Sequence, residues 1–292
     1  MRAAHQAART LPNTEVVKAG ELVEARFAKG SSPSATARKM LALLIQTAAG
    51  DAWKAGPHSA LKRELRGSHN SNDRLGDAFD ELQGTLLRIE TVAPDGRAAA
   101  LVAPVVAYRI EHLEDDDRSR VWWEFSEPAR RAMQGSDHYA AMNRATLLAF
   151  ESRYSITLYE RGALLVGRRV SRWRGTVEEL REVMGVPSGR YRDWADIRRF
   201  VVEPACAEVN LLADFACGWT VEQGPRSKVT AVELWFCPKD QAARTAARGE
   251  LEGTRTGRKA RRSSQEEPSP PQSDLTKALD TLRTDQPLPG AG

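Results

Sequence analysis

Residues 176–210 read TVEELREVMGVPSGRYRDWADIRRFVVEPACAEVN, and this stretch decides the fold. Thr176 is followed three residues later by Glu179, the spacing of a capping box, which predicts that a helix begins at the residue after Thr176. The run Gly185-Val-Pro-Ser-Gly is typical of a turn, so that helix is expected to end just before Gly185. The stretch therefore opens with a capped helix and a tight turn.

A second helix is predicted over about Tyr191–Asp214, with an interruption at Pro204, because proline cannot donate the backbone hydrogen bond of a helix. Two strand-like runs, Phe215–Glu222 and Val229–Cys237, flank the turn-forming sequence QGPRSK. Upstream, Met142–Arg169 has the apolar spacing of one long helix. This order of helices and hairpin is typical of a winged helix, a helix-turn-helix motif extended by a two-stranded wing.

The same order of elements occurs in the first half of the chain. One helix is predicted from Ser34 to Gly50, a short one follows with Ser59 as its N-cap, and a third covers Arg74–Gln83. Two strand-like runs, Leu86–Ala93 and Ala99–Ile110, then flank the turn sequence PDGR. Sequence identity between the halves is slight, but the repeated order of elements predicts tandem domains.

The predicted fold class is therefore α+β, with two tandem winged-helix domains and a disordered C-terminal tail. We place an N-terminal arm at residues 1–30, the first winged helix at residues 31–138 and the second at residues 139–240. Beyond residue 240 the chain is rich in Ala, Arg, Ser, Pro and Gly and has no core-forming periodicity. Residues 241–292 are therefore predicted to form a disordered, basic, Pro-rich tail.

Composition excludes a globally disordered chain and points to an unevenly distributed positive charge. The 292 residues are 41% hydrophobic, and 43 Lys and Arg against 39 Asp and Glu give a net charge of only +4. Residues 161–200, however, hold ten Arg, five carboxylates and no Lys. Arginine suits bidentate contact with guanine edges and phosphates. A solvated helix face would have the same composition, so charge alone leaves both interpretations open.

The three cysteines, Cys206, Cys217 and Cys237, are an odd number without CxxC spacing. We interpret them as buried, inert thiols in a reducing cytosol rather than as disulfides or zinc ligands. The N-terminal sequence lacks the apolar core of a signal peptide, and no apolar run approaches the ~18 residues of a membrane span. The protein is therefore expected to be cytoplasmic, without membrane association.

Motifs of catalysis and cofactor binding do not occur in this sequence. The five histidines are scattered, with no HxH, HExxH or Cys/His pairing, and there is no GxGxxG or Walker P-loop. A rolling-circle replication enzyme would need a metal-binding His pair beside a nucleophilic Tyr, and the His pair is missing. We therefore predict a protein that is not an enzyme and that uses no cofactor or metal.

The predicted helix over residues 191–212 has two chemically distinct sides. One side is mostly apolar and holds Trp194, Ile197, Val201, Ala205, Glu208 and Leu212. The opposite side holds Arg192, Ala195, Asp196, Arg199 and Glu203, with Arg192 and Arg199 two helical turns apart. The major groove has room for one helix and offers guanine acceptors to arginine, so this pattern predicts a recognition helix. Arg198 flanks the apolar stripe, where it would touch phosphate or cover the core.

Further DNA contacts are predicted from the flanking loops and from the first domain. Ser188, Arg190 and the backbone amides at the helix start are placed to bind phosphates. Arg226 and Lys228, at the hairpin tip, would grip the flanking backbone or the minor groove. The equivalent helix of the first domain has a single basic residue, Arg74, among four carboxylates: Asp73, Asp77, Asp80 and Glu81.

That acidic helix predicts a secondary role for the first domain. Carboxylates near phosphates raise the free energy of a complex. The first domain is therefore expected to bind DNA weakly, as an auxiliary contact, or to serve chiefly for protein contacts; the residues available for DNA are Asn70, Asn72, Arg74 and Arg97.

The helix-turn-helix stretch resembles a known family. Val177–Val186 is a leucine-containing helix that ends in Gly-Val, and Tyr191–Asn210 contains an aromatic residue, an Arg-Arg-Phe run, Pro-Ala and Glu-Val-Asn. Together with SRYSITLYE at residues 152–160, these motifs resemble iteron-binding plasmid replication initiators. The sequence departs from the family pattern at Trp194 and Ile197, where Phe is usual, and in a longer, more polar tail.

The resemblance implies functions that spacing alone does not reveal. Such initiators bind repeated origin sites as monomers, recruit host initiation proteins and help to melt the adjacent duplex. As dimers they often repress their own gene, with the first winged helix supplying much of the dimer contact; here Ala99–Ile110 would be the candidate interface. The runner-up interpretation is a transcriptional regulator with tandem winged helices. A replication or repair enzyme is a third, less favoured class.

Overall fold

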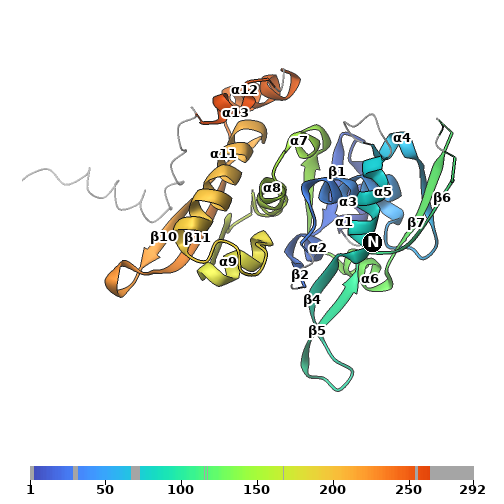
Figure 1. The fold of residues 1–292 in the computed structure, drawn as a ribbon, viewed down its shortest axis with the longest axis horizontal. Helices are drawn as coiled ribbons and strands as arrows, with labels where there is room; N and C mark the ends of the chain where they lie inside the picture. Colours follow the sequence, from blue (N-terminus) through green and yellow to red (C-terminus); the bar gives the residue numbers. More distant parts are fainter. Residues whose placement is uncertain are drawn as a thin grey trace, which may run out of the picture.

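The computed structural model describes residues 3–28, 32–66, 73–114, 116, 118–166, 168–253 and 256–263. Figure 1 shows two lobes, one built around helices α3 and α5 and the other around α8 and α11. A β-hairpin projects from each lobe, β4–β5 from the first and β10–β11 from the second. Each lobe is centred on a buried apolar cluster. The cluster of the second lobe also includes Val16, Val23 and Ala42 from the N-terminal part of the chain, and Leu148 packs against both clusters.

The second lobe has the predicted winged-helix order. Its elements are α8 (Arg153–Leu165), β9 (Arg172–Gly175), α9 (Val177–Met184), α10 (Trp194–Ile197), a π-helical turn (Arg198–Val202), α11 (Glu203–Leu212), β10 (Phe215–Gln223) and β11 (Val229–Pro238). The capping box at Thr176 and Glu179 is present. Strand β9, which the sequence did not predict, pairs with β11, so the sheet order is β10-β11-β9.

The first lobe repeats this plan with additional strands. Its elements are β2 (Arg26–Phe27), α3 (Ala35–Ala48), β3 (His58–Leu61), α4 (Lys62–Leu65), α5 (Asp73–Gly84), β4 (Leu86–Val92), β5 (Ala98–Pro104), β6 (Val106–Glu111), β7 (Arg120–Phe125) and α6 (Glu127–Gly135). They form two three-stranded sheets, β2-β4-β5 and β3-β7-β6. Strands β5 and β6 are therefore the edges of different sheets.

The predicted separate N-terminal arm is wrong. The first residues form α1 (Ala3–Thr10), β1 (Glu15–Ala19) and α2 (Gly20–Glu24). Strand β1 pairs antiparallel with β8 (Tyr139–Asn143), so the two ends of the first lobe meet where the second lobe begins. A five-residue strand shows little periodicity of its own, and its burial depends on a distant partner strand, with Glu15 opposite Asn143 and Ala19 opposite Tyr139.

Three further predicted elements differ from those in the structure. Met142–Arg169 is not one helix, because the chain is extended at Phe150 and Ser152, which separate α7 (Arg144–Ala149) from α8. Ser59 lies in β3 rather than at an N-cap, and the Leu61 N–H donates to Glu64 at 3.0 Å where α4 begins. Ala99–Ile110 is two strands, because the pairing partner changes at Val105 from β4 to β7.

The predicted tail begins as helix instead of disordered chain. Asp240 caps α12 (Gln241–Glu252) by accepting from the Ala243 N–H at 2.8 Å, and Ala247 is buried. Arg258, in α13 (Arg258–Ser263), donates to Glu250 at 3.1 Å, so the two helices are held together. Both helices pack against α11. The remainder of the predicted tail, residues 264–292, lies outside the described residues.

A buried ion pair joins β1 to the first helix of the second lobe. Lys18 Nζ donates to both carboxylate oxygens of Glu160 at 2.9 Å, and both side chains are almost completely buried. Lys18 comes from β1 and Glu160 from α8. Because an unpaired charge is costly in such a position, each side chain depends on the other.

Removing one member of this pair should destabilise the protein strongly. We expect Lys18→Met to lower the free energy of unfolding by about 3–5 kcal/mol, since it leaves the Glu160 carboxylate buried without its partner. The double variant Lys18→Met/Glu160→Leu should recover most of that loss. Arg131→Ala, which breaks an exposed pair with Glu127, is the control and should cost at most about 1 kcal/mol. Urea unfolding measures all three, and equal losses for Lys18→Met and Arg131→Ala would contradict the account.

Candidate nucleic-acid interface

The turn between α9 and α10 is fixed by a buried arginine. Gly185 ends α9, as the sequence predicted, and its backbone is left-handed with φ of 66°. The buried Arg181 guanidinium then donates to the backbone carbonyl oxygens of Arg190, at 2.7 Å, and Tyr191. Tyr191 itself has a left-handed φ of 51°. Arg181 therefore holds the chain where it enters the second helix, a role that the sequence analysis missed because charge counting treats all arginines alike.

The second helix is continuous but contains one wide turn. Asp193 caps it by accepting from the Asp196 N–H at 2.9 Å. The π-helical turn Arg198–Val202 ends two residues before Pro204. Proline lacks an N–H, and in an α-helix its ring would collide with the carbonyl four residues earlier, which belongs to Phe200. A wider turn relieves that collision, and such turns often occur at functional sites.

The two predicted sides of this helix are present. Ile197, Val201, Ala205, Glu208 and Leu212 are buried, and Trp194 is half-buried. Arg199 is exposed on the other side of the helix. The helix begins at Trp194 rather than at the predicted Tyr191, so Arg192 is exposed in the turn just before it. Their contact with DNA stays a prediction, but the surface that they occupy is open to solvent and could enter a groove.

Arg198 is held along the helix surface. Its guanidinium lies 3.4 Å from Glu203, five residues later, and about half of each side chain is exposed. The wide turn brings these two positions together, because a π-helix aligns residues five apart instead of four. Of the two roles considered from the sequence, covering the core does not fit this exposed position, and phosphate contact stays a prediction.

The turn and the wing place their polar residues on the surface. Ser188 and Arg190 are exposed in the turn. Arg226 lies in the short 3-10 turn Pro225–Ser227 between β10 and β11, and its side chain lies outside the description. Lys228, the next residue after that turn, is exposed. Ser188, Arg190 and Lys228 are thus open to solvent, and their contact with phosphates stays a prediction.

Part of the Arg-rich run serves the sheet. Arg172 donates to Glu233 at 2.6 Å, and Arg174 donates to Glu222 at 2.5 Å. Both arginines lie on β9, and their partners lie on the neighbouring hairpin. With Arg181 in the turn, these side chains stabilise the domain, so the ten arginines are not a single DNA-binding surface.

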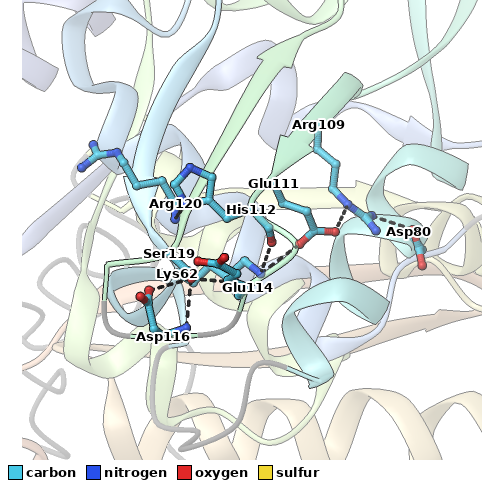
Figure 2. A network of polar contacts seen from close by, with 9 residues as sticks. All are labelled: Lys62, Asp80, Arg109, Glu111, His112, Glu114, Asp116, Ser119 and Arg120. Carbon is cyan, nitrogen blue, oxygen red and sulfur yellow. Dashed lines mark hydrogen bonds and ion pairs between the residues drawn. The ribbon is translucent and has the colours of Figure 1, made fainter.

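The carboxylates of α5 have partners within the first lobe. Figure 2 shows Arg109 reaching Asp80, at 2.6 Å, and Glu111, at 3.2 Å. Lys62 extends this network by lying 3.5 Å from Glu111 and donating to the His112 carbonyl oxygen at 3.0 Å. The acidic face expected for this helix is therefore partly neutralised on one side.

Glu81 also has a structural role. Its carboxylate accepts from the Ser34 N–H at 2.5 Å and from the Ser34 hydroxyl at 2.6 Å, at the start of α3. Arg74 and Asp77 remain exposed on α5, and Arg97 is 87% exposed at the tip of the β4–β5 hairpin, 3.6 Å from Asp95. Asn70 and Asn72 lie outside the described residues, as does the side chain of Asp73.

The cysteines behave as buried thiols. Cys206 and Cys217 are buried and Cys237 is half-buried, and none is in a disulfide. Burial raises the pKa of the Cys217 thiol, which disfavours the reactive thiolate. Within the described residues no three His, Cys, Asp or Glu side chains gather as a metal site, and no helix is both long and apolar enough to cross a membrane.

The architecture defines a tandem winged-helix protein of the α+β class, as predicted. Residues 176–236, which hold α9, the recognition-helix candidate and the wing, match the family model described as "Initiator Rep protein, WH2". The predicted resemblance to replication initiators is thereby confirmed for the second domain. Among curated proteins, none matches the sequence.

A solved structure extends the similarity in fold to both lobes. The chain is similar to the Pi initiator protein, whose crystal structure was determined in complex with iteron DNA, with a TM-score of 0.57 and 14% sequence identity. The match covers 80% of this chain and 100% of that chain. The shared fold therefore includes the first winged helix, which lies outside the family match.

The wing should contribute charge rather than sequence recognition. We expect the double substitution Arg226→Ala/Lys228→Ala to weaken binding to all duplexes and to reduce the slope of log K against log[salt] by roughly two, about one for each lost phosphate contact. The control is Arg63→Ala/Arg131→Ala, which removes two exposed charges from the first lobe. Salt titrations of binding check this, and an unchanged slope for the wing variant would place the wing away from the DNA backbone.

Proposed function

We propose that this chain is a plasmid replication initiator that binds repeated origin DNA sequence-specifically. The observation that carries the proposal is Arg199, exposed on a helix whose opposite side is buried, with Arg192 exposed in the turn directly before that helix. That helix belongs to the segment that matches the initiator family model. The solved Pi initiator, similar in fold, was crystallised with iteron DNA.

Binding would use the two domains unequally. The second helix of the α9–α10 motif enters the major groove, where Arg192 and Arg199 read guanine edges. Ser188, Arg190, Arg198 and the wing contact phosphates and set the register. Arg74 and Arg97 of the first domain add auxiliary contacts. Contact energy at repeated sites is then used to deform the duplex and help it open, with no bond-breaking step by this chain.

The wider role includes protein partners. Bound at the origin in the cytoplasm, the chain recruits host replication initiation proteins. A homodimer in equilibrium with the monomer represses the chain's own gene. Edge strands β5 and β6 suit the dimer contact, because an unpaired strand edge offers backbone groups to a second strand. Val102, 49% exposed, and Ile110, 58% exposed, add apolar surface on those strands.

The arrangement of binding sites tests the proposal. Full-length protein should be footprinted on the DNA that flanks its gene. Protection of a series of direct repeats, with a monomer on each repeat, is the expected outcome. Protection of one palindrome alone would instead support a tandem winged-helix transcriptional regulator. DNA nicking or ATP hydrolysis that survives stringent purification would contradict the non-enzymatic mechanism.

Arg199 should separate specific from non-specific binding. We expect Arg199→Ala to cost about 1–3 kcal/mol on the cognate repeat and to leave random-duplex binding nearly unchanged, because a base-reading arginine acts through guanine acceptors. Arg199→Lys is the matched control, since it keeps the charge and loses the bidentate geometry. Competition gel shifts measure both variants. Equal losses on cognate and random DNA would make Arg199 a phosphate contact.

A further inference from the structure

An aromatic side chain stands exposed on the candidate recognition helix. Phe200 exposes 45% of its surface, whereas its chain neighbours Val201 and Val202 are buried. An isolated exposed apolar residue is ordinary on a protein surface. The position of Phe200, directly beside Arg199 on the side that carries the proposed base contacts, is what calls for an explanation.

Two neighbours hold the Phe200 ring in place. The Tyr191 ring stacks on it with a centroid separation of 5.3 Å and an interplanar angle of 18°. The Arg199 guanidinium lies over it, 5.2 Å from its centroid. The backbone of Tyr191 is in turn bound by Arg181. The ring is therefore pre-organised, which lowers the entropy cost of using it in a complex.

The occupied π surface decides which ligand the ring suits. The Tyr191 ring already stacks on Phe200, and a base paired within a duplex presents its edge in the major groove, so stacking on a base is disfavoured. The 45% of Phe200 that is exposed is apolar surface, which suits a small apolar group. In the major groove of duplex DNA, the thymine C5-methyl is the apolar group that a side chain can reach.

We propose that Phe200 is a specificity-determining residue that contacts a thymine methyl group in the binding site. This inference rests on the proposed function, because it requires the helix to enter the major groove. Adjacent residues on one helix reach neighbouring base pairs, so the thymine lies next to the guanine that Arg199 reads. Tyr191 acts as a positioning residue that keeps the Phe200 ring upright.

Replacement of thymine by deoxyuridine tests the contact, because it removes the methyl group and nothing else. The duplex is a site selected by the full-length protein from a randomised library, and each thymine is replaced singly. We expect one replacement to weaken wild-type binding by about three- to tenfold, the scale of one buried methyl group. The Phe200→Ala variant should bind the thymine duplex more weakly than wild type by a similar factor. It should bind the thymine and deoxyuridine duplexes equally well.

Combining the Phe200→Ala substitution with the thymine-to-deoxyuridine replacement distinguishes a direct contact from a merely structural role of Phe200. If Phe200 only supported the helix, Phe200→Ala would weaken binding to thymine and deoxyuridine duplexes equally, and the wild-type response to deoxyuridine would persist in the variant. Phe200→Leu, which keeps an apolar side chain, should retain part of the response. Val170→Ala, another exposed apolar position in this domain, should behave as wild type.

Failure of this inference differs from failure of the proposed function. A selection that yields no preferred sequence would overturn the proposed function. A preferred sequence that tolerates deoxyuridine at every thymine would overturn the Phe200 contact alone, and that result needs only the wild-type protein. The Phe200 contact would also be overturned if the Phe200→Ala variant still distinguished thymine from deoxyuridine as strongly as the wild type does.

Discussion

The burial of one side of the second helix in the α9–α10 motif determines which side of that helix faces solvent. Ile197, Val201 and Leu212 lie in the core, so the side with Arg199 must face outward, and Arg192 is exposed in the turn that leads into the helix. Glu208, although charged, also holds this helix against the start of α8. Its buried carboxylate accepts from the backbone N–H groups of Glu151, at 2.7 Å, and Ser152, at 3.3 Å, at the start of α8. A carboxylate at a helix N-terminus is favourable because it meets unpaired N–H groups and the positive end of the helix dipole.

The difference between the two domains has a physical origin in their charges. In the second domain, the hairpin carboxylates Glu222 and Glu233 pair with arginines of β9, and Arg199 on the second helix is exposed. In the first domain, Asp80 forms an ion pair with Arg109, and Glu81 accepts a hydrogen bond from Ser34. Asp77 stays exposed beside Arg74. The first domain therefore repels phosphate less than its composition suggests, but its equivalent helix lacks an outward pair of arginines.

Sequence patterns predicted the elements whose signals are local. The capping box at Thr176, the turn at Gly185 and the apolar stripe of the second helix each follow from neighbouring residues. Short strands such as β1 and β9 were missed because their stability comes from partners distant in sequence. The exposure of Phe200 was also not predictable, since an ideal helix places it close to the buried stripe and the wide turn before Pro204 changes that register.

The central claim is that the second domain reads the sequence while the first adds mostly non-specific affinity. The most direct test compares two double variants of the full-length protein, Arg192→Ala/Arg199→Ala and Arg74→Ala/Arg97→Ala. For each, the ratio of affinities for the selected site and for random duplex is measured at one salt concentration. We predict that the first variant brings this ratio close to one, whereas the second weakens both affinities and leaves the ratio nearly unchanged. A ratio that collapses only in the second variant would contradict the account and make the first domain the reader.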